Sequence, residues 1–241
     1  MATTVSRETS HKITPRVPRK PHHRKHDNAA PGKLLREPFS AMSHLVGALL
    51  SIAALVILLV LSHGRPWHIV SFSIYGSSLI LLYTASALYH ALSVRPRYAE
   101  RLRRLDHSMI YLLILGSYAP LCLIALRGAW GWSLFGVEIG LAVTGIAFSM
   151  FWTRVPDWVR LMLYLGMGWL IVIALVPLRA AISNTAWEWL VAGGLTFSIG
   201  AVIFALDRPH LLPGKFHAHD LWHCFVLAGT ICHFIFMLNM V

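Results

Sequence analysis

Residues 217–241 read HAHDLWHCFVLAGTICHFIFMLNMV, in which two histidines four residues apart, His219 and His223, open a stretch that is almost entirely apolar. An α-helix needs about 20 such residues to cross the hydrocarbon core of a bilayer. Residues four apart lie on the same face of a helix. The stretch therefore predicts a membrane-spanning helix that carries two imidazoles on one face near its start.

The rest of the chain also has the composition of a membrane protein. Of its 241 residues, 56% are hydrophobic and only 13% are charged, whereas soluble domains carry about 25% charged residues. Seven apolar segments are long enough to span a bilayer. They lie at about 40–62, 67–92, 106–126, 130–152, 158–178, 187–206 and 217–239. We therefore predict an all-α fold: a polytopic membrane protein whose seven transmembrane helices form one bundle over residues 38–241.

The basic residues predict how this bundle is oriented. Residues 1–37 are polar, proline-rich and basic, which is typical of a disordered tail. Eighteen of the 21 Lys and Arg residues lie in this tail or around the second, fourth and sixth connections; the remaining three are Arg65, Arg127 and Arg179. Because cytoplasmic segments carry the excess of Lys and Arg, the N-terminus is predicted to be cytoplasmic and the C-terminus outside. The net charge of +11 then orients the chain, and we expect no nucleic-acid partner.

This orientation brings polar residues from three helices to one membrane depth. Ser86 and His90 lie at the end of the second helix, Asp106 opens the third, and His219 and His223 open the seventh. Polar side chains inside a membrane usually face the interior of the bundle. Three imidazoles can supply three tetrahedral ligands to Zn²⁺ and leave a fourth position for water. We therefore predict a zinc site on His90, His219 and His223 near the cytoplasmic face.

Asp106 and Ser86 extend this site towards the chemistry of hydrolysis. Bound zinc makes its water more acidic and can polarise a carbonyl group. Asp106 could hold that water or act as a general base, and Ser86 could donate a hydrogen bond to a developing oxyanion. The five residues predict an intramembrane hydrolase of an amide or ester whose apolar chain enters between the helices. Membrane lipids are the expected partners, as substrate or as ligand.

Three further polar residues receive structural interpretations. Asp220 lies between the two histidines in sequence but off their face, so it is predicted to cap the start of the seventh helix. Glu138 lies in the middle of the fourth helix, where it relays protons or, as we favour, is protonated and hydrogen-bonded. His44, at the start of the first helix, is a candidate to support a metal ligand without binding the metal itself. The three cysteines lie in apolar stretches and predict no disulfide framework.

At these residues the chain resembles the hemolysin III family, the bacterial branch of the progestin and adipoQ receptor (PAQR) family in the CREST superfamily. The resemblance covers about residues 36–240, and the matching stretches include REPFSAMSHLVGALLS (36–51), SALYH (86–90), LDHSMIYLLILGSYAP (105–120) and FHAHDLWHCFVLAGTICHF (216–234). The superfamily pattern is S-x-x-x-H in helix two, an Asp at the start of helix three, and H-x-x-x-H in helix seven. Ser86, His90, Asp106, His219 and His223 occupy it here.

The resemblance implies the same seven-helix fold with its tail inside, in a bacterial inner membrane. It also implies zinc on the three histidines, with Asp106 binding the metal's water and Ser86 beside it. Related ceramidases and adiponectin receptors hydrolyse lipid amides, whereas bacterial members are named for haemolysis and linked to membrane-lipid homeostasis. The favoured hypothesis for the function is a hydrolase, and the second is a membrane-homeostasis sensor or regulator with structural zinc. A pore-forming cytolysin is less favoured because no secretion signal is present. The oligomeric state stays open.

Two positions depart from the family pattern. Many bacterial relatives carry Glu where this chain has Asp220, and many carry Asn where it has Ser40. Neither position is one of the predicted ligands, so the expected metal site is retained. The change at Ser40 argues against a role for Glu37 beyond the entrance to the first helix.

Overall fold

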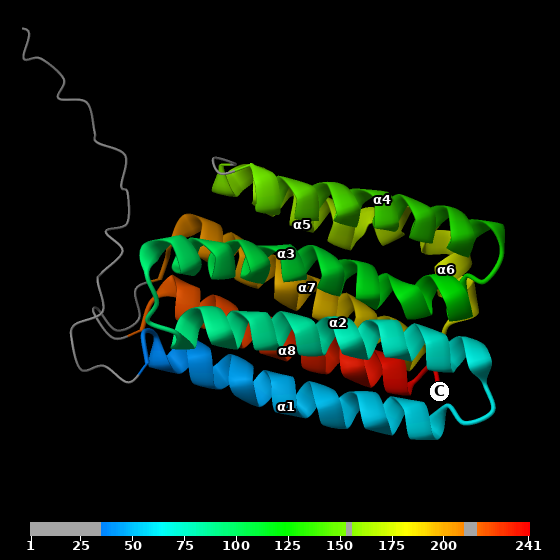
Figure 1. Ribbon diagram of the computed structural model, residues 1–241. Coiled ribbons are helices and arrows are strands. Elements are labelled where there is room, and N and C mark those ends of the chain that lie inside the picture. Colours follow the sequence, from blue (N-terminus) through cyan, green and yellow to red (C-terminus); the bar gives the residue numbers. More distant parts are fainter. Residues whose placement is uncertain (1–34, 153–155, 210–215) are drawn as a thin grey trace, which may run out of the picture. The chain divides into compact units, whose positions relative to one another are not determined.

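The computed structural model describes residues 35–152, 156–209 and 216–241, so most of the predicted tail and parts of two connections lie outside the described residues. The elements are arranged in the order shown in Figure 1. They are α1 (Pro38–Leu61), α2 (Pro66–Ala91), α3 (Pro96–Pro120), the π-helix η1 (Leu121–Ala125), α4 (Ala129–Phe151), α5 (Asp157–Trp169), the 3₁₀-helix η2 (Leu170–Ala174), α6 (Leu175–Ala181), α7 (Asn184–Leu206) and α8 (Ala218–Leu238).

Seven helical spans in the described part of the chain are long and apolar enough to cross a membrane. Five are single helices, while α3 continues into η1, and α5, η2 and α6 together form one span over Trp158–Ala181. The predicted all-α class and the number of spans are therefore confirmed. The direction in which they cross the membrane remains a prediction.

Proline determines where the first three helices begin. Pro38, Pro66 and Pro96 each occupy the first turn of α1, α2 or α3, where the missing N–H would have had no helical acceptor. Side-chain caps are found at the starts of α7 and α8. The Ser183 hydroxyl accepts a hydrogen bond from the Ala186 backbone N–H at the start of α7.

A proline lies next to each of the two irregular segments within the spans. Pro120 is the last residue of α3, and the next five residues adopt π-helical geometry, with the Leu126 N–H bonded to the Leu121 carbonyl at 2.8 Å. Pro177 lies in the first turn of α6, after the 3₁₀ segment η2. The Tyr118 hydroxyl links the span that contains α3 and η1 to the span that contains α5, η2 and α6. It donates to the Met167 carbonyl at 2.8 Å and accepts from the Ile171 N–H at 2.8 Å.

The third helix begins ten residues before the predicted boundary, at Pro96 rather than near Asp106. Its first turns are polar but helical, because Glu100 forms ion pairs with Arg103 and Arg104 at helical spacing. The basic residues assigned to the second connection therefore lie largely on α3, and the connection itself is short. Asp106 consequently lies in the third turn of the helix, not at its start.

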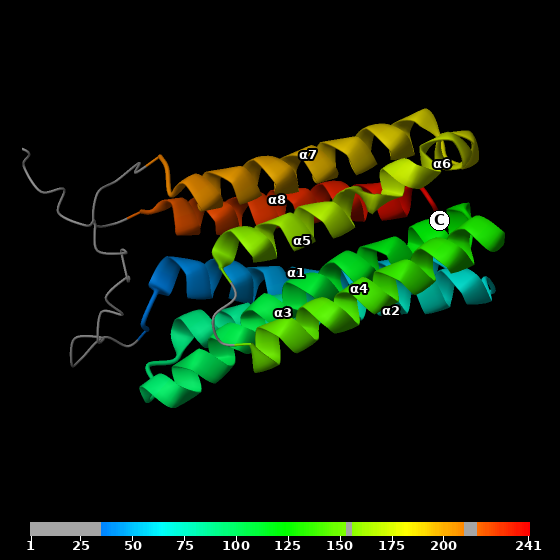
Figure 2. The same ribbon diagram turned by 90° about the horizontal axis from the view of Figure 1, so that it is seen from above.

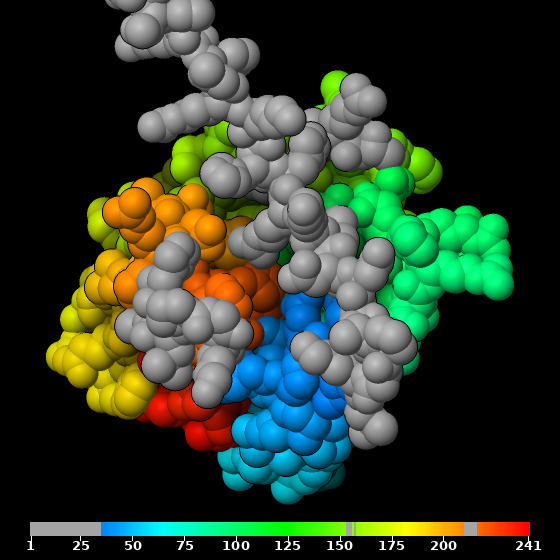
Figure 3. Space-filling view, turned by 90° about the vertical axis from the view of Figure 1, so that its left-hand side faces the viewer, coloured from blue at the N-terminus to red at the C-terminus, as the bar shows by residue number. Residues whose placement is uncertain are grey.

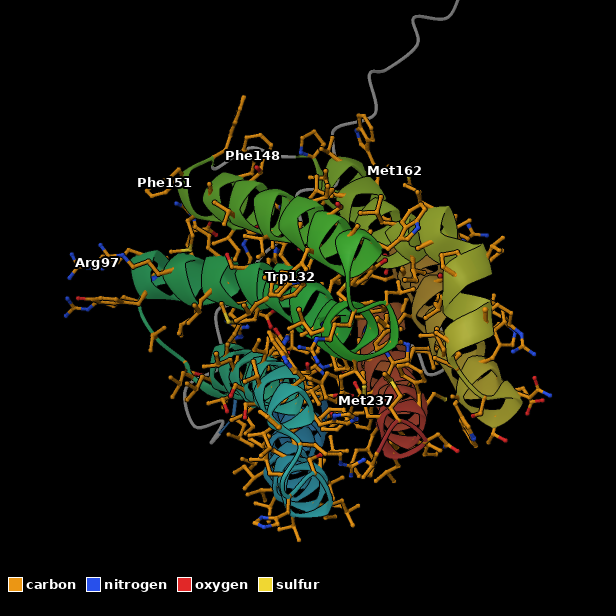
Figure 4. All side chains as sticks on the ribbon, turned by 90° about the vertical axis from the view of Figure 1, so that its right-hand side faces the viewer. Arg97, Trp132, Phe148, Phe151, Met162 and Met237 are labelled. Carbon is orange, nitrogen blue, oxygen red and sulfur yellow. The ribbon has the colours of Figure 1, made fainter. Side chains whose placement is uncertain are left out.

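Neighbouring helices pack pairwise: α1 on α2 and α8, α2 on α3, α3 on α4, and α7 on α8 (Figure 2). The outward faces are strongly apolar, as a lipid environment requires. Phe151 and Met162 are 86% and 53% exposed and point away from α4 and α5, whereas Met237 of α8 is fully buried (Figure 4). Where helices approach closely, small residues allow it: a Cβ at Gly116 would lie 2.1 Å from the Ser78 hydroxyl oxygen.

Candidate metal centre

The five residues predicted to form the site lie at one end of the helical unit. Figure 3 looks onto this end, where α1, α3 and α8 begin. Ser86 and His90 lie in the last turns of α2, and His219 and His223 in the first two turns of α8. His90 and His223 are 1% and 2% exposed, so these imidazoles are buried at the end of a span.

The three imidazoles converge through their Nε2 atoms. The Nε2 of His219 lies 3.1 Å from that of His223 and 3.5 Å from that of His90. One ligand atom from each of the three lies within 4.8 Å of the others, an arrangement that could hold a metal ion. The structure therefore brings together all three histidines that the sequence proposed as ligands.

The spacing suits a tetrahedral ion. Zinc–nitrogen bonds of about 2.0–2.1 Å place neighbouring ligand atoms roughly 3.3–3.4 Å apart, and the two measured separations lie on either side of that value. Neutral imidazoles carry one lone pair each and cannot all satisfy one another by hydrogen bonds. A cation between them would accept all three lone pairs, so the donor set fits a metal with a preference for imidazole.

Glu37 supplies a partner that the sequence argument did not anticipate. Its carboxylate lies 2.5 Å from Nδ1 of His90, and its backbone N–H donates to the His90 carbonyl at 3.0 Å. Burial alone would raise the pKa of Glu37, but its hydrogen bond and electrostatic interaction with His90 and the charge of Arg36 lower it to about 2. A carboxylate on Nδ1 fixes the tautomer that leaves Nε2 free for a metal.

The expectation that Glu37 serves only the entrance to the first helix was therefore wrong. One feature of the sequence could have predicted the contact between Glu37 and His90. Glu37 precedes the first helix at the same predicted membrane depth as the end of the second, which carries His90.

Ser86 and Asp106 form a pair beside the histidines. Ser86 and His90 both lie close enough to Asp106 to interact with its carboxyl group. Both side chains are buried, at 2% and 9% exposure. The role of Ser86 as an oxyanion donor stays a prediction, and the structure adds that Ser86 lies beside Asp106.

His44 of α1 packs against the histidine cluster. Its ring centroid lies 3.8 Å from that of His223 and 5.0 Å from that of Tyr83. The Tyr83 hydroxyl in turn donates to the Thr230 hydroxyl of α8 at 2.8 Å. His44 therefore supports a predicted ligand by ring packing and is not itself part of the converging set.

Ser40 and Asp220 contact each other at the starts of α1 and α8. The Ser40 hydroxyl donates to Oδ1 of Asp220 at 2.8 Å, while Oδ2 accepts the His217 backbone N–H at 3.0 Å. Asp220 thus belongs to a capping box at the start of α8, in agreement with its predicted capping role. The side chain of Asp220 is shorter than that of Glu, and the side chain of Ser40 is shorter than that of Asn. Together they form one link between the starts of α1 and α8.

Glu138 lies apart from this site, in the middle of α4. It is fully buried, and neither carboxyl oxygen has a hydrogen-bond partner among the described residues. The hydrogen bond expected for Glu138 is thus absent from the described part of the chain.

Comparison with known proteins places the chain in a family. The profile of the family described as Haemolysin-III related matches residues 33–234. The chain is 40% identical to "Hemolysin-3" of Bacillus cereus, over 83% of this chain and 89% of that protein. It is 38% identical to the "Hemolysin-3 homolog" of Bacillus subtilis (strain 168), over 83% of this chain and 91% of that protein.

A more distant likeness reaches into plants. The chain is 33% identical to the "Heptahelical transmembrane protein ADIPOR3" of Oryza sativa subsp. japonica, over 66% of this chain and 43% of that protein. The chain therefore belongs to the haemolysin-III-related family, which is related to the PAQR heptahelical proteins, and it is a multi-pass membrane protein with bacterial homologues.

Proposed function

We propose that this haemolysin-III-related protein is a zinc-dependent hydrolase of a lipid amide or ester. The convergence of the Nε2 atoms of His90, His219 and His223 carries the proposal, since it gathers three metal ligands from two helices at one membrane depth. Zinc held there would supply Lewis acidity towards a carbonyl oxygen and increase the acidity of a water.

The protein's own residues would then hold the site and move the proton. Glu37 keeps His90 in the ligating tautomer through its contact with Nδ1. Hydrolysis breaks the acyl C–N or C–O bond, and water gives its hydroxyl to the carbonyl carbon and a proton to the departing amine or alcohol. Asp106, oriented by Ser86, is the carboxylate beside the cluster that could carry this proton.

A lipid substrate suits the position of the cluster. The histidines lie at the end of spans whose outward faces are apolar, so an acyl chain can remain in the bilayer while its amide or ester bond approaches the imidazoles. We place the cluster at the cytoplasmic face of a bacterial inner membrane, from the excess of basic residues at that end. A reporter fused to the C-terminus tests the orientation, and its activity in the cytoplasm would contradict the proposal.

The first experiment measures zinc in the purified, detergent-solubilised protein beside His90→Ala and His219→Ala. About one zinc per chain in the wild type, lost in both variants, is expected if α2 and α8 share one site. Glu138→Gln provides a matched control, because it changes a buried ionisable residue away from the cluster. Well-folded wild-type protein that takes up no zinc when zinc is supplied would overturn the metal site.

The second experiment supplies labelled lipid amides and esters to the zinc-loaded protein. Products that the wild type releases and the metal-free His219→Ala variant does not are the expected result. Turnover by that metal-free variant would contradict a zinc-dependent mechanism.

A sensor or regulator with structural zinc is the second candidate function. The near-complete burial of His90 and His223 favours it, because structural zinc sites are closed whereas catalytic sites keep an open position. This candidate predicts one zinc per chain but no product from any labelled lipid. Released product would exclude it.

The printed name of the Bacillus cereus relative also keeps a pore-forming cytolysin under consideration. Seven apolar spans with lipid-facing surfaces are suited to permanent residence in a membrane, which makes this the weaker candidate. Dye leakage from liposomes at low protein density would revive it.

A further inference from the structure

A second concave site lies at the end of the helical unit opposite to the histidine cluster. A cavity of about 280 Å³ is lined by residues 64–68, which join α1 to α2, and by Leu123, Ile124 and Arg127 from η1 and the connection to α4. Figure 4 looks onto this end of the bundle, with Trp132 of α4 above the start of α2. None of the lining residues belongs to the proposed metal site.

The cavity has the charge of an anion site. Arg65 and Arg127 reach it from two different connections, and no Asp or Glu lines it. Neither arginine forms an ion pair with a carboxylate in the part of the chain that the structure describes. Uncompensated arginines that line a concave surface attract an anion, and guanidinium groups match the geometry of phosphate oxygens.

Both guanidinium groups are held in place without using all of their donors. Nη2 of Arg65 donates to the Leu61 carbonyl at 2.6 Å, which uses one of five N–H groups. The Arg127 guanidinium lies 4.4 Å from the centre of the Trp67 ring, and Trp67 packs edge-to-face on Trp132 with 5.9 Å between ring centroids. A guanidinium stacked on an indole keeps its in-plane N–H groups available for an oxyanion.

We propose that this cavity binds the phosphodiester of a membrane-lipid headgroup in the leaflet opposite the histidine cluster. The cavity lies at the ends of spans, where lipid phosphates are found, and Trp67 and Trp132 provide the indoles typical of that depth. Leu123, Ile124 and Pro66 line the same space and match the apolar part of a lipid better than a free, fully hydrated phosphate ion.

The test is lipid retention by the detergent-solubilised full chain, followed by native mass spectrometry. Phosphatidylglycerol and diacylglycerol with identical acyl chains are added separately to the wild type, Arg65→Gln and Arg127→Gln. We expect the wild type to bind phosphatidylglycerol and not diacylglycerol. Each variant should bind phosphatidylglycerol roughly tenfold more weakly, as the loss of one charge-assisted contact implies.

Arg179→Gln is the matched control. Arg179 belongs to the α6–α7 end of the molecule and also lies over a tryptophan, Trp187, at 5.8 Å, but it does not line the cavity. Its replacement should leave retention of phosphatidylglycerol unchanged. Arg127→Lys keeps the charge and should recover part of the lost binding, which also separates a folding defect from a lost contact.

Three results would overturn the proposal. Equal retention of phosphatidylglycerol and diacylglycerol would show that acyl chains alone are bound. Equal weakening by Arg179→Gln would show a diffuse effect of charge at the membrane surface. Displacement of the lipid by millimolar inorganic phosphate, or binding of that phosphate in the absence of lipid, would reassign the cavity to a free phosphate ion.

Discussion

The histidine cluster and Glu138 are two buried ionisable regions that differ in their surroundings. The cluster receives side chains from α2, α3 and α8 and from the residues just before α1, and its members contact one another. Glu138 is equally buried, yet its carboxyl oxygens have no hydrogen-bond partner among the described residues. Burial alone therefore does not distinguish a site, whereas convergence from several helices does.

The two regions should respond differently to substitution. In the cluster, each polar group depends on others, so removing one leaves its neighbours unpaired or misdirected. At Glu138, a substitution disturbs little beyond the residue itself.

Asp106→Asn should cause the largest change, in catalysis. An amide cannot take up the proton that Asp106 is proposed to carry, so turnover of any lipid amide or ester accepted by the wild type should fall about 10²–10⁴-fold. Zinc content should remain near the wild-type value. Glu100→Gln is the control, since Glu100 is a carboxylate on the same helix whose partners within the described residues are Arg103 and Arg104. Unaltered turnover in Asp106→Asn would remove Asp106 from the mechanism.

Glu37→Gln should weaken zinc binding without abolishing it. Loss of the carboxylate on Nδ1 of His90 is expected to lower metal affinity about 10–100-fold, as for other carboxylate–histidine pairs. Competition with a chelator of known affinity measures the change. If affinity stays at the wild-type value while His90→Ala loses the metal, the short contact has no part in orienting His90.

Ser40→Ala should reduce stability more than it affects the metal. It removes the hydrogen bond to Asp220 that links the starts of α1 and α8, with an expected loss of about 1.5 kcal/mol in the free energy of unfolding in detergent. Ser43→Ala is the control, because the Ser43 hydroxyl donates to the Ser40 carbonyl within its own helix. An equal loss in both variants would mean that the link between the helices contributes nothing.

Glu138→Gln should produce the smallest effect. A neutral amide is close in shape to the carboxyl group and avoids an uncompensated charge in the interior, so the free energy of unfolding should change by less than about 1 kcal/mol. Zinc content should be unaltered. A loss of several kcal/mol, or loss of zinc, would show that Glu138 is coupled to the rest of the bundle in the same way as the members of the histidine cluster.

Much of the fold could be predicted from the sequence because a bilayer imposes strong one-dimensional rules. Apolar length determines a span, and all seven spans were found to within a few residues except the start of α3. That boundary was missed because the first turns of α3 are polar, and their helical form depends on ion pairs of Glu100 with Arg103 and Arg104 rather than on hydropathy. Hydropathy measures burial in lipid and not helix formation.

The candidate ligands were predictable for a related reason. Helix direction and the i to i+4 spacing placed His90, His219 and His223 at one depth, and the structure brings them together. The partners of the ligands were not predictable. Glu37 reaches His90, and His44 packs on His223, only through the lateral packing of α1 against α2 and α8.

The class of protein, the number of spans and the cap formed by Asp220 follow from local patterns in the sequence, as does the predicted depth of the polar residues. Which side chains meet, including Ser40 with Asp220 and Ser86 with Asp106, follows from how the helices pack. The physical reason is that depth follows from position along a helix, which is local. Contact also requires the rotation and neighbours of each helix, which arise from packing between distant segments of the chain.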